Sequence, residues 1–235
     1  MSAVSEDSFW GAVTVLDVRS AADPQAGRPY PTYYGCTFRV LDLIGGADKE
    51  LWYRISDGIV DKLFVKAEAI RQILSEEFTS LSPNVPLDMK RIDVDLKQQF
   101  VTAFEGDKIV FGTRVATGAV FRNADGTVQS FAPTPGDHRI YEKRPSRRMI
   151  GGPAGDASSY DLPGINWVSY FTRTRIAFHV TYWHNYCSRP RSHGCVNMLP
   201  EDAKWVYRWT LPAAEYDAPA TFTEARDDGS LVRVF

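Results

Sequence analysis

The sequence predicts a mainly β protein that consists of a small N-terminal β-barrel domain and a larger β-rich domain with short helices. Two observations favour this class. Short segments rich in β-branched and aromatic residues recur along the chain, whereas a clear helical pattern appears only after residue 200. Aromatic residues reach 13% of the 235 residues, including eleven Tyr and six Trp, and such side chains pack well on sheets.

The N-terminal domain is expected over residues 1–84. Three short strands are predicted there, at 33–40, 51–55 and 63–66, with a turn at 56–58. Residues 67–74 are predicted to form a short helix or a helical turn, because Ile70 and Leu74 are four positions apart. Several short strands within about 80 residues are typical of a small barrel or a sandwich.

A linker is predicted at residues 79–91, which are rich in Ser, Pro and Asn and show no periodicity. The second domain is expected over 92–235. Its first strand is 92–96, where apolar and charged residues alternate. Residues 100–104 and 108–111 flank a Glu-Gly-Asp turn and predict a hairpin.

Further strands are predicted at 113–118, 139–142, 167–171 and 176–180. A helix is predicted to begin at Pro200, because proline suits the first helical position and Glu201 and Asp202 suit the positive helix start. Pro212 is expected to stop this helix, and Leu199 is a poor cap for it.

Composition excludes several classes of function. The formal net charge of −2 gives no sign of nucleic-acid binding. The sequence contains no run of 18 apolar residues and therefore predicts no membrane-spanning helix, and its first residues lack the pattern of a signal peptide. The three cysteines include no CxxC pair, so a structural zinc site is not expected.

Ser192-His193-Gly194-Cys195-Val196-Asn197 is the segment that predicts chemistry. It places a thiol two residues after an imidazole, and a second imidazole, His179, lies upstream on a predicted strand. A thiol paired with an imidazole is the usual arrangement for nucleophilic acyl transfer. Gly194 allows a sharp turn that exposes backbone N–H groups to a developing oxyanion. Cys195 is therefore the predicted nucleophile and His179 the predicted base.

Structural alternatives exist for each of these residues. Cys195 could be a buried structural cysteine, and His179 could be a core histidine. The proton could also be taken by His193, which could instead shape the oxyanion loop. His184 is interpreted as a loop residue near the groove. Metal binding by these histidines and cysteines matches no closed zinc pattern, so no metal is predicted.

A basic run, Arg139, Lys143, Arg144, Arg147 and Arg148, has two interpretations. It could be a solvated loop, or it could be a lid that attracts the carboxylates of an acidic substrate. Arg189 and Arg191 lie beside the cysteine motif and could meet a carboxylate more directly.

These residues resemble the L,D-transpeptidase catalytic domain of the YkuD type over about residues 92–217. The similarity rests on His179 and on 192–197. Weaker support comes from segments 92–96, 134–135, 162–167 and 181–185. The resemblance implies a mostly β catalytic fold with short helices and no cofactor.

The resemblance also implies roles for individual residues. Cys195 would be the nucleophile, His179 its proton acceptor, and the Val180 carbonyl would orient the His179 ring. Amides around His193, Gly194 and Cys195 would form the oxyanion hole. Residues 134–162 would form a lid. The residues expected to bind substrate are Val180, Tyr182, Trp183, His184, Arg191, Ser192 and Asn197.

The sequence departs from the family pattern in four places. Gly136 precedes Asp137 where the family usually has a variable residue before Gly, and Val180 replaces the more usual Gly. Cys187 stands where Gly is common, and Asn197 stands where many members have Arg. The first 80 residues resemble, more weakly, the Src-homology-three-like barrels of bacterial envelope proteins, which implies either wall binding or a scaffold.

The implied function is cross-linking of the bacterial cell wall. The cysteine would take the acyl group of a tetrapeptide stem of peptidoglycan, release D-Ala and pass the acyl group to an acceptor amine. One alternative is hydrolysis of the same acyl-enzyme, as in an L,D-carboxypeptidase or endopeptidase; another is a non-catalytic wall-binding protein. The resemblance further implies an exported, monomeric protein that carbapenems acylate.

Overall fold

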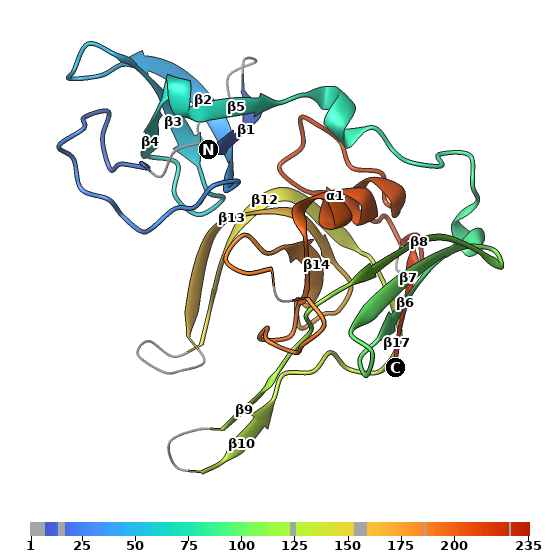
Figure 1. The fold of residues 1–235 in the computed structure, drawn as a ribbon. Helices are drawn as coiled ribbons and strands as arrows, with labels where there is room; N and C mark the ends of the chain where they lie inside the picture. The colour runs from blue at the N-terminus through green and yellow to red at the C-terminus, as the bar shows by residue number, and fades with distance from the viewer. Residues whose placement is uncertain (1–7, 14–16, 123–125, 153–158, 186, 226) are drawn as a thin grey trace. The chain divides into compact units, whose positions relative to one another are not determined.

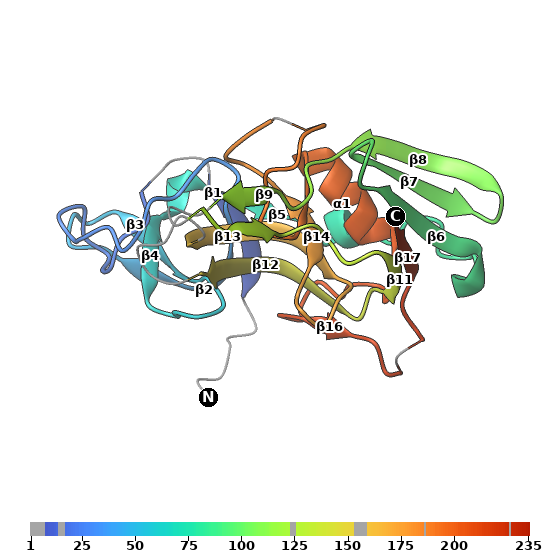
Figure 2. The ribbon, with the colours of Figure 1, turned by 90° about the horizontal axis from the view of Figure 1, so that it is seen from below.

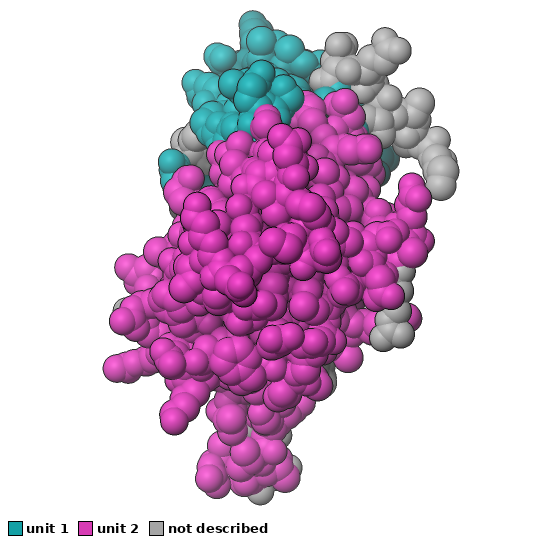
Figure 3. All heavy atoms as spheres, turned by 90° about the vertical axis from the view of Figure 1, so that its right-hand side faces the viewer, with its two compact units in different colours: residues 1–77, 145–151, 160–166 teal, residues 78–144, 152–159, 167–235 magenta. Residues whose placement is uncertain are grey.

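The fold is described from a computed structural model that covers residues 8–235, apart from 14–16, 123–125, 153–158, 186 and 226. The chain forms two compact units, coloured separately in Figure 3. Unit 1 comprises 1–77 together with 145–151 and 160–166; unit 2 comprises 78–144, 152–159 and 167–235. A single cut at residues 84–92 would not separate these two units, because 145–151 and 160–166 belong to the first unit.

Unit 1 is built on a five-stranded sheet with the order β4-β3-β2-β1-β5 (Figure 1). Its strands are β1 (Phe9–Val13), β2 (Thr37–Gly45), β3 (Leu51–Ser56), β4 (Leu63–Lys66) and β5 (Ile70–Ile73). Each pair of neighbouring strands in this sheet is antiparallel. Phe38, Trp52, Ile55 and Val65 are fully buried and form much of its core.

The prediction at 67–74 is correct only for a helical turn at the start of the segment and wrong for the rest of it. Residues Ala67–Ala69 form a single 3₁₀ turn, and Ile70–Ile73 form β5, which pairs antiparallel with β1. Ile73 is buried in this pairing opposite Trp10. The spacing of two apolar residues could not reveal this, because partners far away in the sequence supply the hydrogen bonds. Two further 3₁₀ turns follow at Ser75–Phe78 and Leu87–Met89.

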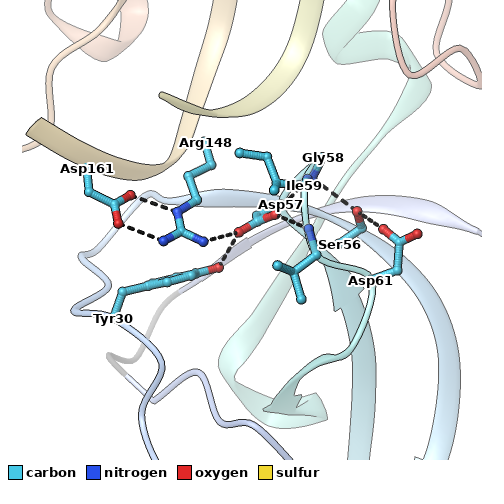
Figure 4. A network of polar contacts seen from close by, with 9 residues as sticks. Tyr30, Ser56, Asp57, Gly58, Ile59, Asp61, Arg148 and Asp161 are labelled. Atoms are coloured by element: carbon cyan, nitrogen blue, oxygen red, sulfur yellow. Dashed lines mark hydrogen bonds and ion pairs between the residues drawn. The ribbon is translucent and has the colours of Figure 1, made fainter. Parts of the chain in front are cut away.

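A buried carboxylate organises the polar interior of unit 1 (Figure 4). Asp57 Oδ1 accepts the N–H groups of Ile59 and Val60, at 2.8 and 2.7 Å. Its Oδ2 accepts the Tyr30 hydroxyl at 2.8 Å and lies 3.3 Å from the Arg148 guanidinium. Arg148 also binds Asp161 at 2.6 and 2.7 Å. Arg148 and Asp161 belong to the two later segments, so this network joins them to the N-terminal sheet of the same unit.

The first sheet of unit 2 has the order β11-β17-β6-β7-β8. Its strands are β6 (Lys90–Asp95), β7 (Phe100–Glu105), β8 (Lys108–Arg114), β11 (Gly136–Arg139) and β17 (Leu231–Val234). The predicted hairpin at 100–111 is present as β7 and β8. A strand was predicted at 113–118, but β8 ends at Arg114 and the following residues make only isolated bridges. Sequence analysis missed β17, which pairs in parallel with β6.

The second sheet has the order β15-β14-β13-β12-β16. Its strands are β12 (Glu142–Gly151), β13 (Tyr160–Tyr170), β14 (Ala177–Val180), β15 (Val196–Met198) and β16 (Thr221–Phe222). Residues 145–151 of β12 and 160–166 of β13 belong to unit 1. Strands β9 (Val120–Arg122) and β10 (Val128–Ser130) make a separate antiparallel pair.

The helix α1 (Pro200–Trp209) begins and ends close to the predicted limits. Leu199 supplies no side-chain cap, as its apolar side chain implies. Figure 2 shows α1 beside the sheet of β6, β7 and β8. The Phe111 and Trp205 rings stack at 4.2 Å, and the Thr113 hydroxyl donates to Asp202 at 2.6 Å, so these contacts join α1 to that sheet.

The basic run at 139–148 is not a solvated loop, because most of it lies in β12. Lys143 is fully buried, and its Nζ donates to the carbonyls of Tyr207 and Thr210 at 2.6 and 2.5 Å. Lys90 Nζ likewise donates to the Trp209 carbonyl at 2.9 Å. These two lysines satisfy carbonyls at the end of α1 that have no partner within the helix. Part of the predicted lid at 134–162 lies at 153–158, outside the described residues.

The molecule is thus mainly β, as predicted. Among the described residues, none of the helices is both long and apolar enough to cross a membrane.

Candidate active site

Two neighbouring parallel strands position the predicted catalytic residues. Strand β14 carries His179 and pairs with β15, so that His179 lies opposite Asn197. Cys195 directly precedes β15, two residues before Asn197. Side chains two positions apart on a strand share a face, and paired residues of neighbouring strands do so as well. The sheet register therefore places His179 beside Asn197, and Cys195 lies at the start of the strand that carries Asn197.

The His179 side chain is held in one orientation by its own strand. It is 3% exposed, and its Nδ1 lies 2.8 Å from the carbonyl of Val180. A hydrogen on Nδ1 makes this contact, which leaves Nε2 as the acceptor. Burial lowers the pKa of His179 to about 4, although the Val180 hydrogen bond opposes that shift. The imidazole is therefore neutral at pH 7 and able to accept a proton.

The Cys195 thiol is also neutral at rest. Desolvation raises its pKa to about 11, although the Ala177 N–H and the charge of Arg175 pull the pKa down. The residue as a whole retains partial exposure to solvent. Its Sγ lies 3.9 Å from the carbonyl of Arg175, which closes the turn before β14. In this state the sulfur thus contacts the backbone on the N-terminal side of β14.

The turn before Cys195 is held by Ser192. The Ser192 hydroxyl donates to the Cys195 carbonyl and accepts the Gly194 N–H at 3.1 Å. Gly194 has φ of +124°, a conformation that residues with a Cβ rarely adopt. Because the Gly194 N–H is already bound to Ser192, this amide does not point freely toward a substrate, contrary to its predicted place in an oxyanion hole.

Aromatic and polar side chains surround the His179–Asn197 pair. The ring of Trp183 lies 6.1 Å from that of His179, and the ring of Tyr182 lies 5.0 Å from that of Trp183. Asn197 Nδ2 lies 3.3 Å from Nε2 of His184. Among the residues that the structure describes, the buried Oδ1 of Asn197 has no hydrogen-bond partner.

The other two predicted residues lie at the border of this group. Arg191 is exposed, and its charge helps burial to lower the pKa of His184. The ring of His193 contacts Phe131, with centroids 5.2 Å apart, and burial lowers its pKa as well. His193 therefore packs against Phe131, whereas His179 lies on β14.

Sequence analysis missed Arg175, whose carbonyl contacts the thiol, and Glu142, which binds the Arg175 guanidinium. Arg175 precedes β14, and its guanidinium binds the buried carboxylate of Glu142 at 3.2 and 3.3 Å. The Thr-Arg-Thr-Arg segment reads as an ordinary polar turn, and the Glu142 partner is 33 residues away. No local pattern could have indicated this pair.

No metal centre is evident in the part of the chain that is described, since it contains no group of three or more His, Cys, Asp or Glu side chains that could hold an ion. The polar groups at the site are a thiol, imidazoles, an amide and a guanidinium. This set is suited to acyl transfer, in which a sulfur nucleophile and a neutral base cooperate.

A known protein family matches the larger part of the chain. Residues 89–233 match the YkuD family, the L,D-transpeptidase catalytic domain. This match spans more than half of the 235 residues, so the chain belongs to the YkuD family, whose members are L,D-transpeptidases. Among curated proteins nothing matches.

Several solved L,D-transpeptidases are similar in structure. That of Mycobacterium smegmatis is 18% identical, with a TM-score of 0.47 over 63% of this chain and 58% of that chain. That of Stackebrandtia nassauensis is 24% identical, with a TM-score of 0.41 over 68% and 63%. L,D-transpeptidase 3 of Mycobacterium tuberculosis is 16% identical, with a TM-score of 0.45 over 63% and 61%. The chain thus spans about three-fifths of the length of these relatives.

Proposed function

We propose that this protein is a peptidoglycan L,D-transpeptidase in which Cys195 is the nucleophile and His179 is the general base. The observation that carries the proposal is the pairing of β14 with β15, because β14 carries a neutral imidazole and Cys195, a residue with partial exposure, directly precedes β15. Membership of the YkuD family supports the same reaction.

In the proposed first half-reaction, Nε2 of His179 takes the thiol proton as the sulfur attacks a donor carbonyl. A sulfur–carbon bond forms, the carbon–nitrogen bond to the terminal D-Ala breaks, and the imidazolium gives its proton to the leaving amine. The thiol and the imidazole are both neutral at rest, so the proton moves during the attack rather than before it. Rotation about the Cys195 side chain would bring the sulfur from the Arg175 carbonyl toward Nε2.

The second half-reaction regenerates the thiol. An amine of another stem peptide attacks the thioester, a carbon–nitrogen bond forms, and the carbon–sulfur bond breaks. His179 takes the proton of the amine and returns it to the sulfur. Water in place of the amine would give hydrolysis, the reaction of a carboxypeptidase.

The oxyanion is proposed to be bound by backbone amides at the cysteine turn. The Gly194 N–H is bound to Ser192. The proposed donors are therefore the backbone N–H of Cys195 and that of the nearby His193. Such donors stabilise a tetrahedral intermediate because they are fixed before the reaction begins. Trp183, Tyr182, Asn197 and Arg191 are proposed to line the groove for the stem peptide.

The substrate implies action outside the cytoplasm, where peptidoglycan lies. We propose that residues 1–84 form the Src-homology-three-like domain, which binds or positions the wall substrate, and that 92–235 form the catalytic domain.

Incubation of the protein with tetrapeptide stems, followed by mass spectrometry, tests the proposal. Cross-linked dimers with loss of D-Ala are expected. Tripeptides alone would instead show hydrolysis. An absence of both products, together with no covalent adduct from a carbapenem, would contradict the enzyme and favour a wall-binding protein.

A further inference from the structure

The backbone of Arg175 is part of the surroundings of the thiol. Its carbonyl lies 3.9 Å from Sγ of Cys195, and its N–H donates to the Thr172 carbonyl at 2.9 Å. Arg175 has φ of +66°, which a residue with a Cβ adopts at some cost. The turn therefore fixes the backbone of Arg175 beside the sulfur of Cys195.

The guanidinium of Arg175 is held from two sides. Two of its nitrogens lie 3.2 and 3.3 Å from the two carboxylate oxygens of Glu142, whose side chain is 3% exposed. Its Cζ lies 4.1 Å from the centre of the Tyr170 ring, which is buried. A guanidinium that is bound to a buried acid and stacked on a ring loses little further freedom when a ligand binds.

The cluster retains a positive charge and free donor capacity. Glu142 is shared with Arg144, so two guanidinium groups face one carboxylate and the sum of formal charges is +1. The Arg175 side chain is 44% exposed, and of the five N–H donors of its guanidinium Glu142 engages two, while the Tyr170 hydroxyl is a further hydrogen-bond partner. The charge acts on the sulfur, because it opposes the rise in the Cys195 pKa that burial causes.

We propose that Arg175, held by Glu142 and Tyr170, is a carboxylate-binding residue of the candidate active site and orients an acyl donor that ends in a free carboxylate. This inference rests on the proposed function, since it names the part of the donor that Arg175 meets. Planar guanidinium donors match the two oxygens of a carboxylate. Arg175 takes the role that sequence analysis considered for Arg189 or Arg191, because it is fixed next to the thiol.

A test that does not need turnover compares two alkylating reagents at Cys195 in a Cys187→Ser background. Iodoacetate carries a carboxylate and iodoacetamide is its neutral analogue, so the ratio of their rates reports the charge beside the sulfur. We expect Arg175→Gln to lower this ratio about fivefold, and Arg175→Lys to retain most of it. Salt should reduce the ratio in the parent protein. Peptide mapping locates the adduct at Cys195.

Arg173→Gln is the matched control, because it removes the same charge from an exposed position two residues away. It should leave the ratio unchanged. An unchanged ratio in Arg175→Gln, or an equal fall in Arg173→Gln, would overturn the proposal.

A second measurement uses tetrapeptide donors with a C-terminal acid or amide. Arg175→Gln should raise KM about tenfold for the acid and little for the amide. If the KM values of the acid and the amide rise equally, Arg175 is not the carboxylate receptor. If the alkylation ratio falls as expected but neither donor is turned over by the parent protein, the anion site stands and the proposed transpeptidase activity fails.

Discussion

His179 and Cys195 are both kept uncharged by burial. The pKa of His179 falls to about 4 and that of Cys195 rises to about 11, each mainly through desolvation. Over the range between these values the resting pair is a thiol and an imidazole rather than an ion pair. The reaction therefore depends on a proton transfer within a fixed geometry, and its rate should be sensitive to either side chain.

Removal of the sulfur tests the nucleophile directly. Cys195→Ala should abolish turnover and acylation by a carbapenem, because no other group at the site can form the thioester. Mass spectrometry of the adduct measures this, and thermal unfolding serves as the control for the fold. Cys187→Ser is the matched variant and should be acylated at nearly the parent rate. Acylation of Cys195→Ala at the parent rate would contradict the mechanism.

Removal of the base should slow the reaction without removing the nucleophile. His179→Ala should reduce the acylation rate roughly a hundredfold, as loss of a general base does. Stopped-flow measurement of acylation tests this expectation. If His179→Ala reacts at the parent rate and His193→Ala does not, the proton acceptor is His193.

The buried imidazole should also make stability depend on pH. The folded-state pKa of about 4 lies below the ordinary value of 6.5, so the unfolded chain binds more protons between these values. The contribution of the neutral His179 imidazole to the free energy of unfolding is complete above about pH 6.5 and is lost as pH falls toward 4. The total is about 3 kcal/mol. Urea unfolding of the parent and of His179→Gln at pH 7 and pH 4.5 should show a smaller pH effect in the variant.

At the scale of elements, buried lysines explain how α1 ends. Lys143 comes from β12 and Lys90 from β6, and both donate to carbonyls at the C-terminal end of the helix. Burial lowers the pKa of each lysine, to a greater degree for Lys143. Lys143 of the basic run thus serves the interior of unit 2, although the run looks like a surface loop in the sequence.

Loss of the Lys143 amine should destabilise the fold. Lys143→Met leaves the carbonyls of Tyr207 and Thr210 without their donor, which should cost about 2 kcal/mol. The free energy of urea unfolding measures this effect. Lys97→Met removes an exposed lysine and is the control, with a change within about 0.5 kcal/mol. Equal stability of Lys143→Met and the parent would contradict the capping role.

At the scale of the whole molecule, compact units do not follow chain order. Unit 1 needs 145–151 and 160–166 in addition to its N-terminal sheet. Cys36 illustrates this dependence, because it is fully buried and its Sγ contacts the Pro163 carbonyl at 3.3 Å. The Ser146 hydroxyl likewise donates to the Thr37 carbonyl.

A fragment of residues 1–84 should therefore be less stable than the same residues within the whole chain. The Cys36 thiol is the reporter: it should resist a thiol reagent in the whole chain and react readily in the fragment. Cys187→Ser and Cys195→Ala in the whole chain remove the other two thiols. Equal protection of Cys36 in both proteins would show that the later segments are not needed.

The sequence by itself determined the β class, the hairpin at 100–111, the helix after Pro200 and the family, because alternation, turn residues and the motif at 192–197 are local patterns. Only the tertiary structure decided that 70–73 is a strand, that β17 joins β6, that Lys143 is buried and that Arg148 binds the buried Asp57. It alone placed the Arg175 carbonyl beside the thiol and paired the Arg175 guanidinium with Glu142. Each of these depends on partners distant in the chain, whose hydrogen bonds and desolvation override local propensity.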